Sequence, residues 1–245
     1  MNHATERARA ASRAGASIVR SVVMDEAANA GGLYHAECWA PVPHHLREYI
    51  ELRDEIAILV AGRLTRPVWD RLESLRKDLD AIPQELKWHD GFRNTVVTEG
   101  KNAALTHFLK GSSYTASQVL GLIEDTGYSA ISATNTAANI TAAGGGSPTN
   151  GWNEAPSATF ATRGTPSFGT AGSGSLATSS AVSCSIIATD TIKGAFLMCR
   201  SAAGTAPTTT VGNTNGALYS AGLFTGGDRA VANGDTLNVS YTASL

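Results

Sequence analysis

The most regular pattern of apolar and polar positions lies between residues 45 and 80 and predicts two helices. The second helix is indicated by apolar residues at steps of four, three and four: Val68, Leu72, Leu75 and Leu79. A matching stripe ends before Gly62 and consists of Leu52, Ile56, Leu59 and Val60. Pro67 suits the first turn of the second helix, and Pro83 suits the position just past its end. We therefore expect an antiparallel helical hairpin with a short loop.

The charged residues of this hairpin are expected to form its solvated face: Arg71, Glu73, Lys77 and Asp78. Further along, residues 101–110 predict a short helix that ends at Gly111, because glycine commonly follows a helix. The apolar run at residues 119–123 is then typical of a buried strand.

Beyond Tyr128 the pattern changes to short β-type segments separated by turns. Strands are predicted at residues 181–187, 191–198, 218–224 and 236–241. The turns, in which asparagine and glycine would supply positive φ, are Asn215-Gly216, Gly226-Gly227-Asp228 and Asn233-Gly234-Asp235. Residues 141–170 predict a long loop held in place by Trp152 and Phe160. The expected fold class is mainly β, a sandwich or barrel of jelly-roll-like form, with an N-terminal arm and an inserted α-helical hairpin.

Charge is distributed very unevenly along the chain. All six histidines and 32 of the 40 charged residues precede residue 128, which leaves eight charges in the last 118 residues. The composition marks off an alanine-rich arm (1–32) that ends in the breaker pair Gly31-Gly32, and it changes sharply near residue 127. So few charges protect sheet edges poorly against association. We therefore expect a protein that works in an assembly, with a solitary, well solvated β domain as the alternative.

The net charge, the lengths of the apolar stretches and the number of cysteines argue against several classes of partner and compartment. A net charge of −2 over 245 residues provides no positive field for nucleic acid, so no specific nucleic-acid partner is expected. No stretch has the apolar length of a signal peptide or a membrane span, which predicts no membrane association and a cytosol-like compartment. Cys38, Cys184 and Cys199 are an odd number of cysteines, and we expect them to be reduced and buried.

No motif indicates catalysis, so we expect a protein that is not an enzyme and has no cofactor or metal. The serines lack a nucleophile elbow, no histidine follows His107, and the cysteines form no Cys-x-x-Cys pair. Four carboxylates are conceivable as a glycosidase pair, although no spacing fixes two of them face to face: Glu99, Glu124, Asp125 and Glu154. Asp228 and Asp235 could hold calcium, but a role in turn formation is favoured.

A metal site built from histidines is a further alternative. If the strands around Cys38 and Trp88 pair, they could bring together His35, His44, His45 and His89. We favour surface and helix-start positions for these four histidines.

Several longer strings stand out in the sequence. Those in the first half are Gly31-Gly-Leu-Tyr-His-Ala-Glu-Cys38, Trp88-His-Asp90, Val97-Thr-Glu-Gly-Lys-Asn102, Gly111-Ser-Ser-Tyr-Thr115 and Leu120-Gly-Leu-Ile123. Those in the second half are Gly194-Ala-Phe-Leu197, Leu218-Tyr-Ser-Ala-Gly-Leu-Phe-Thr-Gly-Gly-Asp-Arg229 and Asn233-Gly-Asp-Thr-Leu-Asn-Val-Ser-Tyr241. Together they resemble a family of tailed-bacteriophage virion structural proteins. The match covers residues 31–40 and 85–245, and the last two strings are its most specific part.

The resemblance implies a β-rich particle protein, similar to those that decorate or cement a capsid, often as trimers. Its implied partners are the major capsid protein and further copies of itself, in a virion assembled in the bacterial cytoplasm. In the family pattern the strands near Cys38 and Trp88 are neighbours in a hairpin, whereas here residues 43–83 separate them. The resemblance therefore implies an N-terminal arm (1–32), a β-rich domain (33–42 and 84–245) and an inserted helical hairpin (43–83). This insertion and the arm are natural places for contacts specific to one particle. The predicted partner-binding residues are Arg7, Arg9, Arg13 and Arg20.

Two other functions remain open from the sequence. One is a structural role at the portal, neck, tail or fibre base, which differs from a capsid role in copy number. The other is a carbohydrate-binding or carbohydrate-cleaving tail module, for which Trp152 and Tyr219 would be the exposed aromatic residues.

Overall fold

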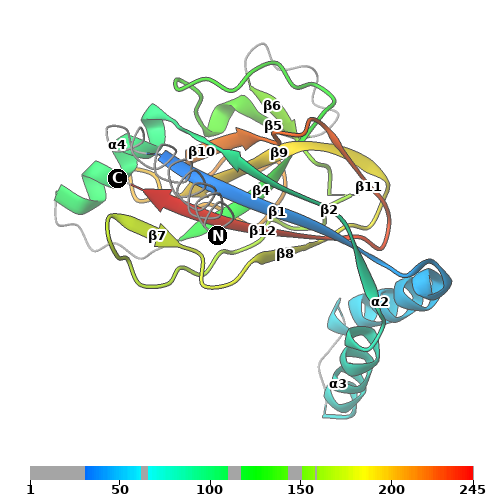
Figure 1. Ribbon diagram of the computed structural model, residues 1–245. Coiled ribbons are helices and arrows are strands. Elements are labelled where there is room, and N and C mark those ends of the chain that lie inside the picture. The colour runs from blue at the N-terminus through cyan, green and yellow to red at the C-terminus, as the bar shows by residue number, and fades with distance from the viewer. Residues whose placement is uncertain (1–30, 62–65, 110–116, 143–150, 158, 245) are drawn as a thin grey trace, which may run out of the picture.

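The computed structural model describes residues 31–61, 66–109, 117–142, 151–157 and 159–244. Within these ranges the protein is mainly β, with two sheets, one of them a half-barrel, and a few helices that include a helical pair (Figure 1). The predicted fold class is thereby confirmed.

The first sheet joins the two ends of the described chain. Its order is β2-β1-β12-β7, and β8 also pairs with β12. The strands are β1 (Gly31–Pro41), β2 (Gln84–Arg93), β7 (Ser175–Ala177), β8 (Val182–Ser185) and β12 (Thr236–Ser244). In β12, Leu237, Val239 and Tyr241 are buried while the residues between them are partly exposed, as expected for a strand with one face on the core. The alternation predicted for residues 236–241 is therefore confirmed.

The second sheet has the order β3-β10-β9-β4-β6-β5, and β11 pairs with β9. Its strands are β3 (Thr95–Val96), β4 (Gln118–Glu124), β5 (Ile140–Ala142), β6 (Trp152–Glu154), β9 (Asp190–Cys199), β10 (Ala217–Leu223) and β11 (Arg229–Val231). The strand pairs are antiparallel, except that β5 and β6 are parallel. Each strand predicted beyond Tyr128 has a counterpart in the structure: β8, β9, β10 and β12.

The hydrophobic core has two layers, one on each face of the second sheet. The layer between the sheets contains Leu120 and Leu197 from the second sheet together with Val239 from the first. The layer on the other face contains Ile123 and Phe196. Because β4 and β9 are buried on both faces, their apolar residues form continuous runs rather than an alternating pattern.

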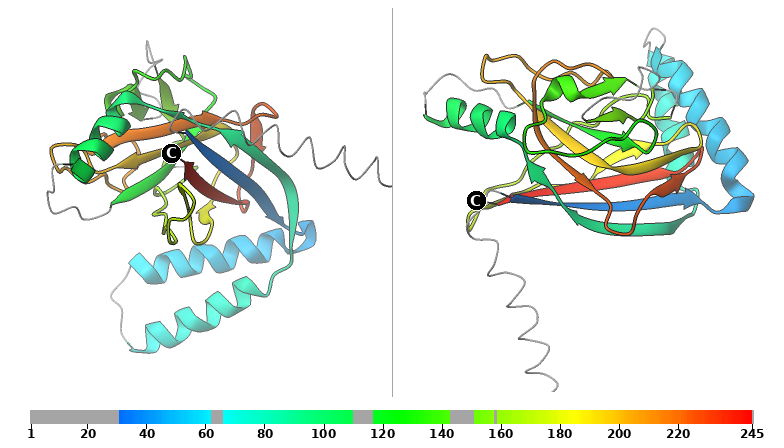
Figure 2. Two further views of the ribbon diagram at one scale, coloured as in Figure 1. Left: turned by 60° about the vertical axis from the view of Figure 1, so that its left-hand side comes forward. Right: turned by 90° about the horizontal axis from the view of Figure 1, so that it is seen from above.

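A short 3-10 helix and two α-helices lie between β1 and β2, in the order η1 (Pro43–His45), α2 (Leu46–Ala61) and α3 (Arg66–Asp80). This is the predicted helical hairpin, with Pro67 in the first turn of α3 and Pro83 just beyond its end. The predicted apolar stripe is the buried face, since Leu72 and Leu75 are almost fully inaccessible. Despite the intervening helices, β1 and β2 pair, with Cys38 opposite Trp88. The left view in Figure 2 shows the hairpin projecting from the sandwich.

Three details differ from the sequence expectation. Helix α4 (Thr98–Leu109) begins three residues earlier than predicted. The predicted loop at 141–170 contains β6 and the end of β5, although Trp152 and Phe160 are buried as expected, and η2 (Ala137–Asn139) precedes it. In the three predicted turns the positive φ values belong to Gly216, Gly227 and Gly234, and to none of the asparagines. Glycine adopts a positive φ at these positions at little cost, because it has no Cβ that would clash with the backbone.

Candidate functional site

The base of the helical hairpin is fixed to the sandwich by hydrogen bonds from three places. The backbone N–H of Val42 donates to the Pro83 carbonyl oxygen at 3.0 Å, which closes the hairpin where it leaves the sheet. The hydroxyls of Tyr49 and Thr236 share a hydrogen bond of 3.3 Å between α2 and β12. Arg53 donates from Nη1 to the carbonyl oxygen of Ile186 at 3.0 Å. The direction of the hairpin is therefore set by the sandwich.

The two helices are held to each other by a narrow apolar seam and one ion pair between them. Leu72 and Leu75 fill the seam on the α3 side. Outside the seam, Arg71 donates to one carboxylate oxygen of Glu55 at 2.9 and 3.0 Å. Because both side chains are about half exposed, this pair contributes less than about 1 kcal/mol. The other predicted solvated residues, Glu73, Lys77 and Asp78, are exposed as expected.

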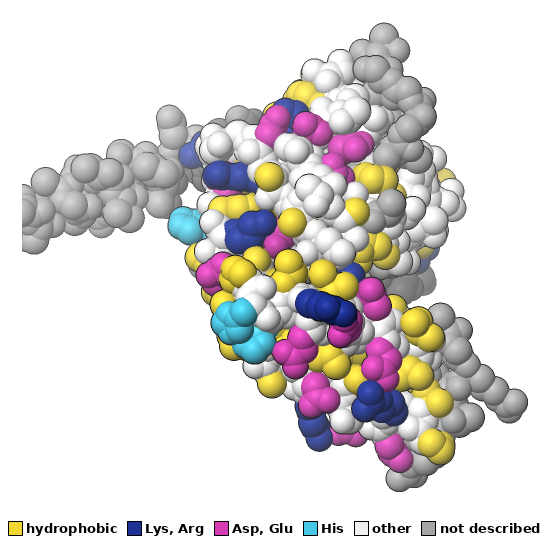
Figure 3. All heavy atoms as spheres, turned by 90° about the vertical axis from the view of Figure 1, so that its right-hand side faces the viewer, with side chains coloured by type: hydrophobic (Ala, Val, Ile, Leu, Met, Phe, Trp, Pro, Cys, Tyr) yellow, Lys and Arg dark blue, Asp and Glu magenta, His cyan; other side chains and the backbone are white. Residues whose placement is uncertain are grey.

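Large apolar side chains remain exposed at the far end of the hairpin. Ile58 is 72% exposed and Val60 is 51% exposed in the last turn of α2, and Trp69 is 52% exposed in the first turn of α3. Both helix ends flank the connection at residues 62–65, so these three side chains lie near the tip. We call Ile58, Val60 and Trp69 the apolar tip. Figure 3 shows apolar side chains among the acidic and basic groups that cover the hairpin. We regard the apolar tip as a candidate contact surface, because large apolar side chains gathered on a surface favour association.

The arginines predicted to bind a partner, Arg7, Arg9, Arg13 and Arg20, lie outside the described residues. Their chain reaches the sandwich at Gly31, the first residue of β1, whereas the hairpin starts just after Pro41 at the other end of the same strand. Eleven extended residues span about 35 Å. The arm and the hairpin therefore leave the sandwich at opposite ends of β1.

The histidines considered for a metal are not gathered into one site. His35 and His89 lie on the neighbouring strands β1 and β2, opposite Gly91 and Glu37. The rings of His44 and His45 contact each other at a tilt, with centroids 4.1 Å apart, at the start of the hairpin. Within the described ranges no three histidine, cysteine or acidic side chains are arranged to hold a metal ion. The two turn aspartates instead form ion pairs, Asp228 with Lys193 and Asp235 with Lys87.

Glu99 and Glu154, two of the four carboxylates considered for glycoside hydrolysis, have structural partners. Glu99 accepts the backbone N–H groups of Leu218 at 2.7 Å and Ala137 at 2.8 Å, so it links α4 to the second sheet. Glu154 and Arg163 are both fully buried and form two parallel hydrogen bonds of 2.7 Å. We did not predict this pair from the sequence, although Glu154 and Arg163 are the only charged residues between positions 128 and 189.

The other two carboxylates, Glu124 and Asp125, lie together at the end of β4. Burial, and then the negative charges of Asp190 and Asp125, raise the pKa of Glu124 to about 7 from its ordinary value of 4.5. Between pH 4.5 and about 7, the Glu124 carboxyl group is therefore mostly protonated in the folded protein and mostly ionised in the unfolded chain. Below pH 4.5 both states are protonated and the group has no effect on stability. As the pH rises from 4.5 to 7, the folded state loses stability relative to the unfolded chain.

We expect Glu124→Gln to raise the free energy of unfolding at pH 8 by roughly 1 kcal/mol, because solvent screens a partly exposed group, and to leave it unchanged at pH 4. Urea unfolding at the two pH values measures the difference. Glu85→Gln, at an exposed position of β2, is the matched control and should have no effect at either pH. Equal stabilisation by Glu124→Gln at pH 4 and pH 8 would contradict the assignment.

The structure corrects one aromatic candidate for glycan binding. Trp152 is 0% exposed and packs near Phe196, with ring centroids 5.9 Å apart, so it offers no face to a sugar. It is buried in the core layer on the outer face of the second sheet, together with Ile140 and Met198. Tyr219 is partly buried and borders a cavity between the two sheets.

The three cysteines are free and buried, as predicted. Burial raises the pKa of the Cys184 thiol to about 12, which leaves it unreactive at neutral pH. None of the described helices combines the length and apolar character needed to cross a bilayer. Comparison of the chain with protein-family models, with curated proteins and with solved structures found no match.

Proposed function

We propose that this chain is a non-enzymatic structural component of a tailed-phage particle, which decorates or cements the capsid by bridging neighbouring shell subunits. The observation that carries the proposal is the apolar tip at the end of a hairpin whose base is hydrogen-bonded to the sandwich. Exposing Ile58 and Trp69 to water is unfavourable for a solitary protein, and contact with another subunit removes that cost.

The positions of the arm and the hairpin support a bridging role in particular. They leave opposite ends of β1, about 35 Å apart, so they can reach two different neighbours. Two weak contacts made by one chain reinforce each other, because the second forms at high effective concentration once the first is made. The major capsid protein is the proposed partner, with further copies of this chain, in a trimer or another homo-oligomer, as the second.

The sparse charge of the sandwich supports the same proposal. Only eight charged residues follow position 127, and several of them are paired within the fold, such as Glu154 with Arg163 and Lys193 with Asp228. The outward positions of β12 carry threonine, asparagine and serine, which pack closely against another protein with little loss of side-chain entropy. We propose a virion location, with assembly in the bacterial cytoplasm.

The arginines of the arm provide a direct test of this proposal. Reversing their charge in the variant Arg7→Glu, Arg9→Glu, Arg13→Glu, Arg20→Glu should weaken attachment to shells about tenfold or more at low salt, because each contact with an acidic surface is lost. Co-sedimentation with shells that lack this protein measures attachment. Arg47→Glu on the exposed face of α2 is the control. Unchanged attachment of the fourfold variant at low salt would contradict the role given to the arm.

A further inference from the structure

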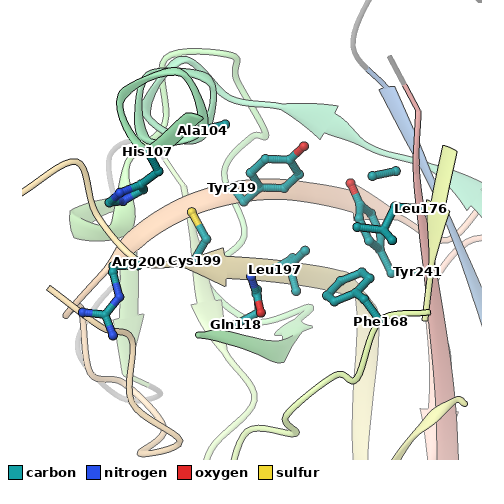
Figure 4. A pocket seen from close by; sticks show the side chains of 11 residues that line it. Ala104, His107, Gln118, Phe168, Leu176, Leu197, Cys199, Arg200, Tyr219 and Tyr241 are labelled. Carbon is teal, nitrogen blue, oxygen red and sulfur yellow. The ribbon is translucent and has the colours of Figure 1, made fainter. Parts of the chain in front are cut away.

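The connection between β9 and β10 carries one of the three Asn-Gly pairs of the chain, Asn215-Gly216. Figure 4 shows Cys199, the last residue of β9, and Arg200, where this connection begins. Gly216 has a φ of 96° and immediately precedes Ala217, the first residue of β10. The Asn-Gly pair therefore lies in the turn through which the chain enters β10.

Both groups that can react in an Asn-Gly pair are accessible in this turn. Glycine has no Cβ to obstruct an approach of its backbone nitrogen to the preceding side chain. The side chain of Asn215 is exposed, and its amide has no hydrogen-bond partner within the part of the chain that the structure describes. The backbone N–H of Gly216 likewise has no acceptor among the described residues. The turn is held instead by the Asn215 N–H, which donates to the side-chain oxygen of Asn213 at 2.8 Å.

The turn before β12 contains the same two residue types, Asn233-Gly234, in a protected setting. The Gly234 N–H donates to the carbonyl oxygen of Ile186 at 3.0 Å, and Gly234 is buried. A Cβ atom on Gly234 would lie only 2.8 Å from Leu46, so α2 packs closely against this turn. The side-chain oxygen of Asn233 is itself buried. A reaction at Asn233 would therefore have to break a hydrogen bond and move the turn away from α2.

We propose that Asn215 is a site of spontaneous deamidation, whereas Asn233 is protected by the fold. The backbone nitrogen of Gly216 attacks the side-chain carbonyl carbon of Asn215 and gives up its proton to solvent. The new carbon–nitrogen bond closes a succinimide ring, and the side-chain nitrogen takes up a proton and leaves as ammonia. Water then opens the ring at either carbonyl and yields aspartate or isoaspartate. Water is the one co-reactant that these steps need.

Deamidation changes both the charge and the backbone at this end of the sheet. A carboxylate at position 215 is added to a region in which only eight charged residues follow position 127. Isoaspartate also adds a methylene group to the main chain shortly before Ala217, which pairs with Cys199 of β9. Deamidated copies therefore accumulate with age and differ from new ones in charge. This chemistry takes place whichever particle or partner the protein meets.

Peptide mass spectrometry of the aged, folded chain tests this site directly. Trypsin separates the two asparagines, because residues 201–229 and 230–245 form different peptides, and fragment ions distinguish Asn215 from Asn213. At mildly alkaline pH, Asn215 should be converted at least about tenfold faster than Asn233, because freeing the Gly234 N–H costs a buried hydrogen bond. In urea, where both turns are unfolded, the two should react at similar rates. Equal conversion of both in the folded chain would overturn the proposal, as would an Asn215 that reacts only in urea.

Labelling by an isoaspartate-specific methyltransferase gives an independent readout. The third Asn-Gly pair, Asn150-Gly151, begins outside the described residues, so every chain in this comparison carries Asn150→Gln. Ageing of the folded chain should raise methyl incorporation, and Asn215→Gln should abolish that rise. Asn233→Gln is the matched control and should leave the rise unchanged. A rise that persists in the Asn215→Gln chain would show that the modified residue lies elsewhere and would overturn the assignment.

Discussion

Replacing Arg163 with methionine is expected to lower the free energy of unfolding by about 3–5 kcal/mol, because the buried carboxylate of Glu154 would lose its counter-charge. Both side chains are fully buried in the folded protein, and the guanidinium holds both carboxylate oxygens at 2.7 Å. The carboxylate also accepts the backbone N–H of Gly212 at 2.7 Å, and Arg163 donates to the Thr208 carbonyl oxygen at 3.3 Å. The pair thus ties β6 to the connection between β9 and β10. Urea unfolding followed by circular dichroism measures the loss.

A matched double variant separates loss of the charge pair from loss of packing. Glu154→Gln combined with Arg163→Met removes both charges, so it should recover much of the stability that Arg163→Met loses. Arg163→Lys keeps a positive charge but lacks the planar fork that reaches both oxygens, so it should lie between these two variants. A loss below about 1 kcal/mol for Arg163→Met would show that the pair is not needed to hold these segments.

Replacing Trp69 with aspartate at the apolar tip is expected to weaken attachment to capsid shells by about 30-fold or more, while leaving the fold unchanged. A tryptophan that acts as a binding hot spot contributes about 2 kcal/mol or more, and a charge at its position adds a desolvation penalty. Stability should hardly change, because the side chain is already 52% exposed in the free protein. Ile58→Asp on the facing helix should act in the same direction. Co-sedimentation with shells that lack this protein measures attachment.

The control for the tip variants is Ser74→Asp, which adds the same charge to an exposed polar position of α3. It should attach like the unmodified chain. Attachment of Trp69→Asp at the unmodified level would show that the apolar tip does not contact the shell.

The parts of the fold that the sequence predicted are those with strong local patterns. The leucine spacing at Leu72 and Leu75, together with Pro67 and Pro83, specifies the hairpin through short-range geometry alone. The longer strands β9 and β12 likewise show apolar runs or alternation over nine or ten residues. The strands β3, β5, β6, β7 and β11 have only two or three residues each. A period of two cannot be recognised over so short a length, and pairing with distant strands decides their structure.

The candidate site was less predictable than the fold. Trp69 lies in a helix whose apolar stripe was evident, but periodicity does not reveal which apolar residue lies outside the buried face at the tip. Glu154 and Arg163 were visible as isolated opposite charges in a long uncharged stretch, which is a signal for a buried pair.

The most direct test of the proposed function is the copy number of this chain in purified particles, measured by quantitative mass spectrometry against the major capsid protein. A cement or decoration protein follows the symmetry of the shell, so we predict a ratio between about three tenths and one. A ratio of roughly one in a hundred would contradict the capsid role, because symmetry at the neck, tail or fibre base allows only a few copies per particle.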